Sequence, residues 1–176
     1  MNSQAILGRS IFESYGLVAN VNAQALHALL EILALIPMDI NGLAHIILTA
    51  GDFEKSTAFY REFLPKLGMT IVLDNNEMLY GVGARTALGI RPPSDVNNGK
   101  TFDQGHVGLH HYCFRAKNTE TVDEVHDVLK GLDAKIIHAP EKGPWAPGYY
   151  SVLFEDPDGI RGEVNYVPGK GLLKDT

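Results

Sequence analysis

Two stretches of the chain, residues 43–72 and 109–137, repeat one pattern of hydrophobic and polar positions. Each begins with an apolar, strand-like run, passes through a polar turn into an amphipathic helix, and returns to a second strand. The helical apolar positions are Phe53, Ala58, Phe59, Phe63 and Leu64 in the first copy, and Val122, Val125, Val128 and Leu129 in the second. The pattern predicts an internal repeat with a period of about 66 residues.

Strand-like runs follow both predicted helices. They read MTIVL, EMLYGVG and TALGIR in the first copy, and KIIHA, YYSVLFE and RGEVNYV in the second. Each copy is therefore predicted to be a βαβββ module, which places the protein in the α+β class. We place module one at 41–93 and module two at 108–168, in a single domain at 41–171 that is followed by a tail at 172–176.

The N-terminal part of the chain stands apart from this repeat. Its apolar run at residues 24–37 carries leucines at helical spacing and stops at Pro37. The run is too short to cross a bilayer, and it lacks the basic flank and cleavage site of a signal peptide. We predict an N-terminal extension over residues 1–40, with an extra amphipathic helix that covers its own domain or a partner subunit. A homodimer is the expected assembly.

Composition narrows the classes of partner and compartment. Hydrophobic residues make up 45% of the 176 residues and charged residues 20%, as in ordinary globular domains. The net charge of -6 argues against a surface for nucleic acid or an anionic membrane, because such surfaces need clustered Lys and Arg. The single cysteine, Cys113, cannot form an internal disulfide, which favours a reducing compartment. We expect a cytoplasmic protein with a small-molecule partner.

Two neighbouring histidines in the second copy are separated by the repeat. His45 lies seven residues before Asp52 and His111 lies seven before Asn118, so His111 is the repeat partner of His45. Because side chains alternate along a strand, His110 is predicted to pack or hydrogen-bond on the opposite face. His27, His126 and His138 receive no role from the pattern. The predicted inward faces are His45, Ile47 and Thr49 in one copy, and His111, Cys113 and Arg115 in the other.

A carboxylate completes a group of metal-ligand types. Glu163 stands among apolar residues on the last predicted strand, where a buried carboxylate needs a cation or metal partner. Two neutral imidazoles, from His45 and His111, and this carboxylate on neighbouring strands would leave coordination positions open. This set favours Fe(II), with Mn(II), Co(II), Ni(II) or Zn(II) as alternatives.

These residues carry a resemblance to a known family. The strings HIILTAGDFEKSTAFYREFLPKLG, HYCFRA and FEDPDGIRGEV are similar to the vicinal oxygen chelate superfamily, which includes glyoxalases, bleomycin-resistance proteins and extradiol dioxygenases. The resemblance covers residues 41 to about 171. It implies two paired βαβββ modules that form a curved, barrel-like mixed sheet with helices outside. It also implies metal ligands at His45, His111 and Glu163. A fourth position falls at about Ala87 or Leu88, where no side chain can bind a metal.

The three-ligand set resembles that of extradiol dioxygenases and implies a metal-dependent, oxygenase-like enzyme. Its substrate would be a small molecule, aromatic in the dioxygenase case, that chelates the metal through vicinal oxygens. A glyoxalase or other lyase, an isomerase, a thiol transferase and a metal-free drug-binding resistance protein stay open as alternatives. The acid–base tyrosine of the dioxygenases corresponds to about Leu153, so Tyr149, Tyr150 and Arg115 are the catalytic candidates. Trp145, with either tyrosine, is predicted to form an aromatic wall.

Overall fold

The computed structural model describes residues 26–28, 30–31, 40, 42–169 and 171. The chain divides into two units, residues 1–41 and 42–176. The helix predicted over 24–37 lies mostly outside the described residues, although residues 26–28, 30 and 31 are helical. The tail predicted at 172–176 also lies outside them. Within the described part of the chain, no helix combines the length and the hydropathy needed to cross a membrane.

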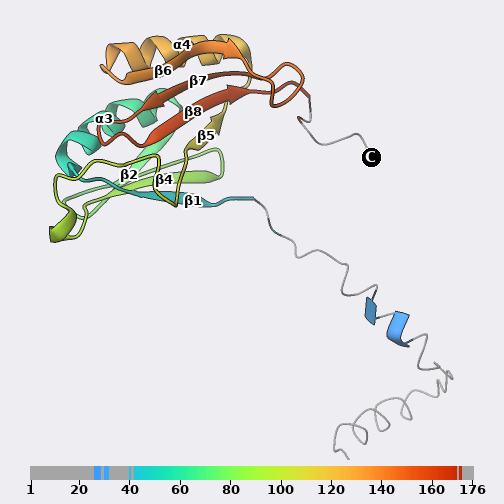
Figure 1. Ribbon diagram of the computed structural model, residues 1–176, viewed down its shortest axis with the longest axis horizontal. Helices are drawn as coiled ribbons and strands as arrows, with labels where there is room; N and C mark the ends of the chain where they lie inside the picture. Colours follow the sequence, from blue (N-terminus) through green and yellow to red (C-terminus); the bar gives the residue numbers. More distant parts are fainter. Residues whose placement is uncertain (1–25, 29, 32–39, 41, 170, 172–176) are drawn as a thin grey trace, which may run out of the picture. The chain divides into compact units, whose positions relative to one another are not determined.

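The second unit is built from two βαβββ modules (Figure 1). Module one contains β1 (His45–Thr49), α3 (Phe53–Lys66), β2 (Thr70–Asp74), β3 (Leu79–Gly83) and β4 (Thr86–Arg91). Module two contains β5 (Tyr112–Arg115), α4 (Thr119–Gly131), β6 (Lys135–Lys142), β7 (Tyr150–Glu155) and β8 (Arg161–Tyr166). A short 3-10 helix, η1 (Asp95–Asn97), lies in the connection between them. The predicted α+β class and the repeat are confirmed.

Each module forms its own four-stranded mixed sheet. The strand orders are β1-β4-β3-β2 and β5-β8-β7-β6, with the first strand parallel to the last and the other pairs antiparallel. Both first strands are therefore edge strands. Among the described residues no strand pairing joins the two sheets, so the predicted curved sheet is present as two separate sheets.

Both helices begin at the polar residue that aligns the two copies. The side chain of Asp52 accepts a hydrogen bond from the Lys55 amide at 3.0 Å, and that of Asn118 accepts one from the Thr121 amide at 2.8 Å. Each satisfies an amide that would otherwise lack a partner in the first helical turn. The same capping hydrogen bond, to the amide three residues further on, recurs in both copies and fixes the start of each helix relative to the strand before it.

Aromatic side chains join the modules through a common core. Phe154 of β7 lies against α3, with its ring centroid 5.3 Å from that of Phe63 and 6.3 Å from that of Phe59. Phe63 and Phe154 are fully buried, and residues of both modules belong to one hydrophobic cluster. Burying such rings removes apolar surface from water in both modules at once.

A buried polar network crosses the same junction. The Tyr60 hydroxyl donates to Asp156 at 2.8 Å and lies 2.9 Å from the Tyr112 hydroxyl. Asp158 accepts the Asp52 amide at 3.0 Å and the Ser56 hydroxyl at 2.7 Å. Burial raises the pKa of Asp156 to about 6, against the hydrogen bonds it accepts. The turn between β7 and β8 thus holds α3 through two carboxylates, at its N-cap Asp52, at Ser56 and at Tyr60.

Candidate functional site

The structure brings His111 and Glu163 together. His111 directly precedes β5, and its Nε2 lies 3.2 Å from Oε2 of Glu163 on β8. The Glu163 side chain is only 9% exposed, while that of His111 is 35% exposed. Glu163 stands between Cys113 of β5 and Leu153 of β7 in the strand register. An imidazole and a buried carboxylate that face each other are two ligands of the kind that divalent transition metals prefer.

Glu163 uses its second oxygen to bind Tyr149. The Tyr149 hydroxyl donates a hydrogen bond to Oε1 of Glu163. Burial, followed by this hydrogen bond, raises the pKa of Tyr149 to about 12, so the phenol keeps its proton at neutral pH. Tyr150, the next residue, points elsewhere, because its hydroxyl donates to Asp123 of α4 at 2.8 Å. Of the two predicted tyrosine candidates, the structure brings only Tyr149 to Glu163.

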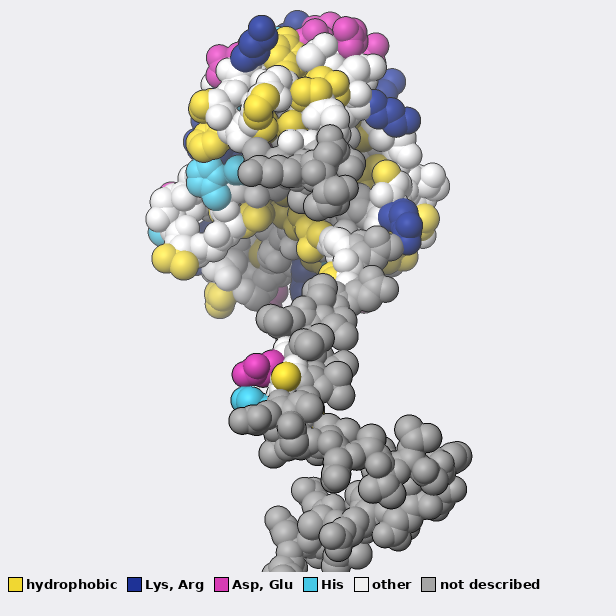
Figure 2. Space-filling view, turned by 90° about the vertical axis from the view of Figure 1, so that its right-hand side faces the viewer, with side chains coloured by type: hydrophobic (Ala, Val, Ile, Leu, Met, Phe, Trp, Pro, Cys, Tyr) yellow, Lys and Arg dark blue, Asp and Glu magenta, His cyan; other side chains and the backbone are white. Residues whose placement is uncertain are grey.

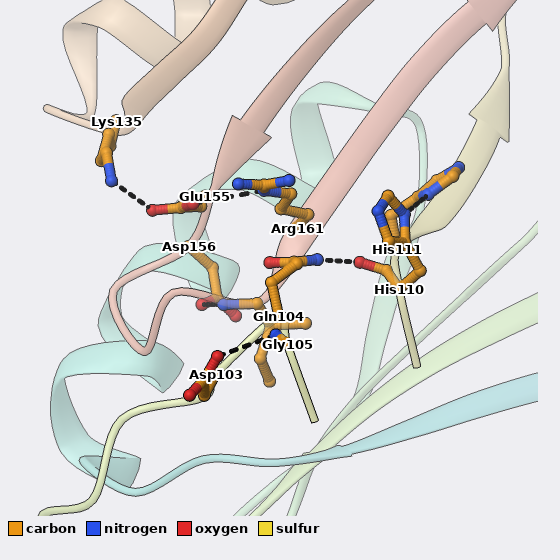
Figure 3. A network of polar contacts seen from close by, with 10 residues as sticks. Asp103, Gln104, Gly105, His110, His111, Lys135, Glu155, Asp156 and Arg161 are labelled. Atoms are coloured by element: carbon orange, nitrogen blue, oxygen red, sulfur yellow. Dashed lines mark hydrogen bonds and ion pairs between the residues drawn. The ribbon is translucent and has the colours of Figure 1, made fainter. Parts of the chain in front are cut away.

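His110 does not occupy the opposite face, as the alternation rule predicted. It is exposed, and its Nδ1 lies 2.7 Å from Nδ1 of His111. The two rings meet edge to face with their centroids 5.0 Å apart, and Gln104 donates to the His110 carbonyl oxygen (Figure 3). The predicted face was wrong because β5 begins only at Tyr112, so the alternation of a strand does not apply to the histidine pair. The predicted hydrogen bonding of His110 is present, with His111 as its partner.

A cavity of about 590 Å³ opens over this pair of ligand types. Aromatic and basic side chains from the β6–β7 hairpin line it, among them Trp145, Tyr149, His138 and Lys142. Trp145 is 72% exposed, so its ring is available to a ligand. The predicted aromatic wall is thus found at Trp145 and Tyr149, and Tyr150 takes no part in it.

His138 is the lining residue that the sequence pattern missed. By simple alternation it would share the core face with Ile136, but the β6–β7 register shifts between these two residues. The shift pairs His138 with Leu153, which itself pairs with Glu163. A β-bulge of this kind reverses the face of every residue beyond it, and the sequence carried no signal for it.

His45, the third predicted ligand, lies at the start of β1 in the other sheet. It is exposed and pairs with Ala87 of β4. Among the residues that the structure describes, no three His, Cys, Asp or Glu side chains come close enough to hold a metal ion. Within one chain, therefore, the structure brings together two of the three predicted ligands.

The strand register identifies the counterpart of Glu163 in module one as Gly89. Glu163 pairs with Cys113, and Gly89 pairs with Ile47, which is the repeat partner of Cys113. The predicted fourth position, at Ala87 or Leu88, is therefore displaced by one or two residues. The expectation that no side chain there can bind a metal holds for glycine as well.

Two other residues of the predicted inward face differ in their distance from the ligand pair, because Arg115 lies apart from it and Cys113 lies opposite Glu163. Arg115 is exposed and lines a different cavity, of about 650 Å³, and not the one over Glu163. Partial burial, followed by the charge of Glu163, raises the pKa of the Cys113 thiol to about 12. A thiol with this pKa is not ionised at neutral pH.

Comparison with known proteins gives one family. Residues 42–164 match the family described as Glyoxalase/Bleomycin resistance protein/Dioxygenase superfamily. The chain is 28% identical over 122 residues to the uncharacterised protein YqjT of Bacillus subtilis (strain 168), a match that covers 68% of this chain and 94% of that protein.

Solved structures agree with this match. A candidate glyoxalase from Bacillus halodurans is 28% identical, with a TM-score of 0.63 over 72% of this chain and 96% of that one. A lactoylglutathione lyase from Agrobacterium tumefaciens shares the fold at 24% identity, with a TM-score of 0.54 over 73% of this chain and 95% of the other.

Proposed function

Because the chain belongs to the Glyoxalase/Bleomycin resistance protein/Dioxygenase superfamily, we propose that it is a metal-dependent enzyme acting on a small molecule. The observation that carries the proposal is the buried Glu163 carboxylate facing the His111 imidazole across 3.2 Å, beneath a cavity. A buried carboxylate is costly unless a cation or hydrogen bonds compensate it. The donor set fits a divalent ion, with Fe(II) favoured and Mn(II), Zn(II), Ni(II) or Co(II) as alternatives.

We assign the third ligand to His45 of a second copy of the chain. His45 lies on an exposed strand face, and that face carries apolar side chains such as Ile47, Val82 and Leu73. Exposed hydrophobic side chains are also visible at the surface in Figure 2. An exposed apolar sheet face of this kind is typical of a surface that is covered by a partner. A homodimer would bring the ligand of one module to the ligand pair of the other.

The substrate proposed for this site presents two neighbouring oxygens and a flat ring. A bound divalent ion would act as a Lewis acid and as a template for such paired oxygens. The glycine at the fourth position leaves coordination places free for them. Trp145 offers a ring face for stacking, and Lys142 supplies positive charge on the cavity wall. An extradiol-type, ring-opening oxygenation of a catechol is the reaction that we propose first.

A lyase of the glyoxalase type is the second candidate, favoured by the 28% identity to the Bacillus halodurans protein. Oxygen uptake with a panel of catechols under Fe(II) distinguishes the two. The oxygenase predicts uptake that is stoichiometric with ring opening. Conversion of a glutathione hemithioacetal without oxygen uptake would show that the protein is a lyase and not an oxygenase.

Metal content tests the site itself. Protein purified without added metal is analysed for bound ions in four forms: wild type, His111→Ala, Glu163→Ala and His106→Ala. His111→Ala and Glu163→Ala should lose the metal, and wild type and His106→Ala should keep it. His106 is a matched control because it is exposed and pairs only with Asp103 at 3.6 Å. Metal retained in His111→Ala or in Glu163→Ala would refute the site.

Subunit mixing tests the shared position of His45. Chains carrying His45→Ala and chains carrying His111→Ala are co-expressed with different tags, and the mixed dimers are purified. If His45 acts across the dimer, one of the two sites in each mixed dimer is intact and binds metal, whereas neither parent variant does. Mixed dimers without metal, beside a wild type that binds it, would place His45 within its own chain.

A further inference from the structure

Both ligand side chains are held from behind by a neighbour. Glu163 turns Oε2 toward His111, while its Oε1 accepts the Tyr149 hydroxyl. His111 turns Nε2 toward Glu163, while its Nδ1 lies 2.7 Å from Nδ1 of His110. The four side chains form a continuous line, Tyr149–Glu163–His111–His110, with the ligand atoms at its centre.

Such neighbours matter because the terminal torsions of carboxylate and imidazole side chains are broad. The last torsions of Glu and His have no sharp staggered minima, so the ligand atoms are oriented mainly by their hydrogen bonds. A bond to Oε1 fixes where Oε2 of Glu163 points, and a bond to Nδ1 fixes where Nε2 of His111 points. Such partners of metal ligands typically change metal affinity 10–100-fold.

The backbone places Tyr149 and His110 firmly enough for this task. The Tyr149 amide donates to the Ala146 carbonyl at 3.0 Å, and the Tyr149 carbonyl accepts the Gly143 amide at 3.1 Å. A Cβ at Gly143 would stand 2.8 Å from the Tyr149 ring, so glycine makes room for it. His110 is anchored by the Gln104 amide, which bonds its carbonyl oxygen. Tyr149 directly precedes β7, and His110 lies two residues before β5.

We propose that Tyr149 and His110 are the positioning residues of this site: Tyr149 orients the Glu163 carboxylate, and His110 orients the His111 ring. The proposal depends on the proposed function for the identity of what His111 and Glu163 bind, which is a divalent cation. Neither residue needs to touch the cation. Their effect acts through the two ligand residues, and it therefore appears in binding before it appears in any reaction.

Zinc affinity gives the first test, with a neighbouring tyrosine as control. Tyr149→Phe and Tyr150→Phe each delete one hydroxyl from adjacent residues, but the Tyr150 hydroxyl bonds Asp123 and not Glu163. Zn²⁺ binding, measured by competition with a chromogenic chelator, should weaken 10–100-fold in Tyr149→Phe and stay unchanged in Tyr150→Phe. Equal affinities in the two variants would overturn the role of Tyr149.

The histidine pair allows the same comparison. His110→Ala should weaken Zn²⁺ binding, whereas His106→Ala should not. His110→Asn keeps a side chain that can hydrogen-bond and should recover part of the loss. An unchanged affinity in His110→Ala would remove His110 from the proposal. Thermal unfolding of each variant checks that a changed affinity does not come from a changed fold.

A measurement on the metal-free protein separates this proposal from the proposed function. The ¹³C signal of the Glu163 carboxyl, assigned by its absence in Glu163→Gln, should move in Tyr149→Phe and not in Tyr150→Phe. The ¹⁵N signal of His111 Nδ1 should move in His110→Ala and not in His106→Ala. If these shifts occur but the wild type binds no metal, the proposed function fails and the positioning stands. If the wild type binds metal but Tyr149→Phe and His110→Ala match their controls in both signals and affinities, the positioning role is wrong and the proposed function stands.

Discussion

The two modules share a backbone plan and differ in what their open sheet faces carry. In module two, Glu163 fills the position opposite Cys113, and His111 and Tyr149 bind its oxygens. In module one, Gly89 takes the place of Glu163. A Cβ built there would stand 2.5 Å from the Ile47 side chain and 2.9 Å from the Tyr80 ring. One face is therefore polar and suited to a ligand, and the other is apolar and suited to a partner surface.

This difference teaches that a repeat predicts backbone better than chemistry. Strand, cap and helix recur because the same local rules act twice. The chemistry of the face depends on a single position opposite the first strand. Where a carboxylate stands, a metal site is possible, and where a glycine stands, side chains from neighbouring strands close over the gap.

The largest effect on stability is expected at the hydrophobic core, which the two modules share and in which they cannot be compared separately. Phe154→Ala removes a fully buried ring that packs on Phe59 and Phe63 of the other module. We expect a loss of about 3–5 kcal/mol in the free energy of unfolding. Because the core is common, probes in the two modules should report one transition in urea. Separate transitions would show that the modules fold independently.

The next effect concerns the polar part of the junction and its pH dependence. The pKa of Asp156 is raised to about 6 by burial, so the folded state holds this proton more tightly than the unfolded state does. The contribution of Asp156 to stability is therefore full below about pH 4 and is lost as the pH rises to about 6. Over this window, the change is on the order of 3 kcal/mol.

The variant Asp156→Asn isolates this contribution. It keeps an oxygen for the amides of Asp158 and Ile160, which lie 2.9 and 2.8 Å from the Asp156 carboxylate, and it cannot ionise. The difference in unfolding free energy between wild type and Asp156→Asn should change between pH 4 and 6 and be flat above pH 7. A flat difference throughout this range would mean that Asp156 titrates normally.

How far the sequence could predict the site depends on the extent of each strand. Within strands the period of two was correct, because Leu48 and Tyr112 are buried while their neighbours Ile47 and Cys113 are exposed. The faces predicted to point inward, however, are the exposed ones in the single chain. Alternation was wrong for His110, which precedes the strand. It gave no role to His138, whose face is set by a register shift. Both errors come from local backbone geometry, on which hydrophobic pattern carries no information.

The hydrogen-bond partners of the site residues could not be predicted from the sequence, for a related reason. Tyr149 and Tyr150 were equivalent candidates, because both lie at the boundary between a loop and a strand. Only the fold shows that one hydroxyl reaches Glu163 and the other reaches Asp123. The ligand types themselves were predictable, because Glu163 among apolar residues already indicated an interior carboxylate.

A smaller effect tests whether the apolar face of module one can be made to resemble module two. Gly89→Glu places a carboxylate at the position that matches Glu163, against Ile47 and Tyr80. We expect a loss of about 1–3 kcal/mol from overpacking and no additional bound metal. Gly131→Ala is the control, because nothing lies within 4 Å of a Cβ there. A stable Gly89→Glu variant that binds more metal per chain than the wild type would contradict this expectation.

The smallest effect on stability, and the most specific for ligand binding, is expected at Trp145. Trp145 is 72% exposed and lines the cavity, so Trp145→Ala should change the unfolding free energy by no more than about 0.5 kcal/mol. Affinity for a flat aromatic ligand should nevertheless fall, because stacking contributes about 0.5–1.5 kcal/mol. Titration with a catechol, followed by calorimetry in wild type, Trp145→Ala and Trp145→Phe, measures the affinity, and unfolding in urea measures the stability. Since phenylalanine retains a ring face, it should preserve most of the affinity. Equal weakening in the two variants would mean that the indole contributes through its N–H group, and the cavity would then select a hydrogen-bond acceptor in place of a planar ring.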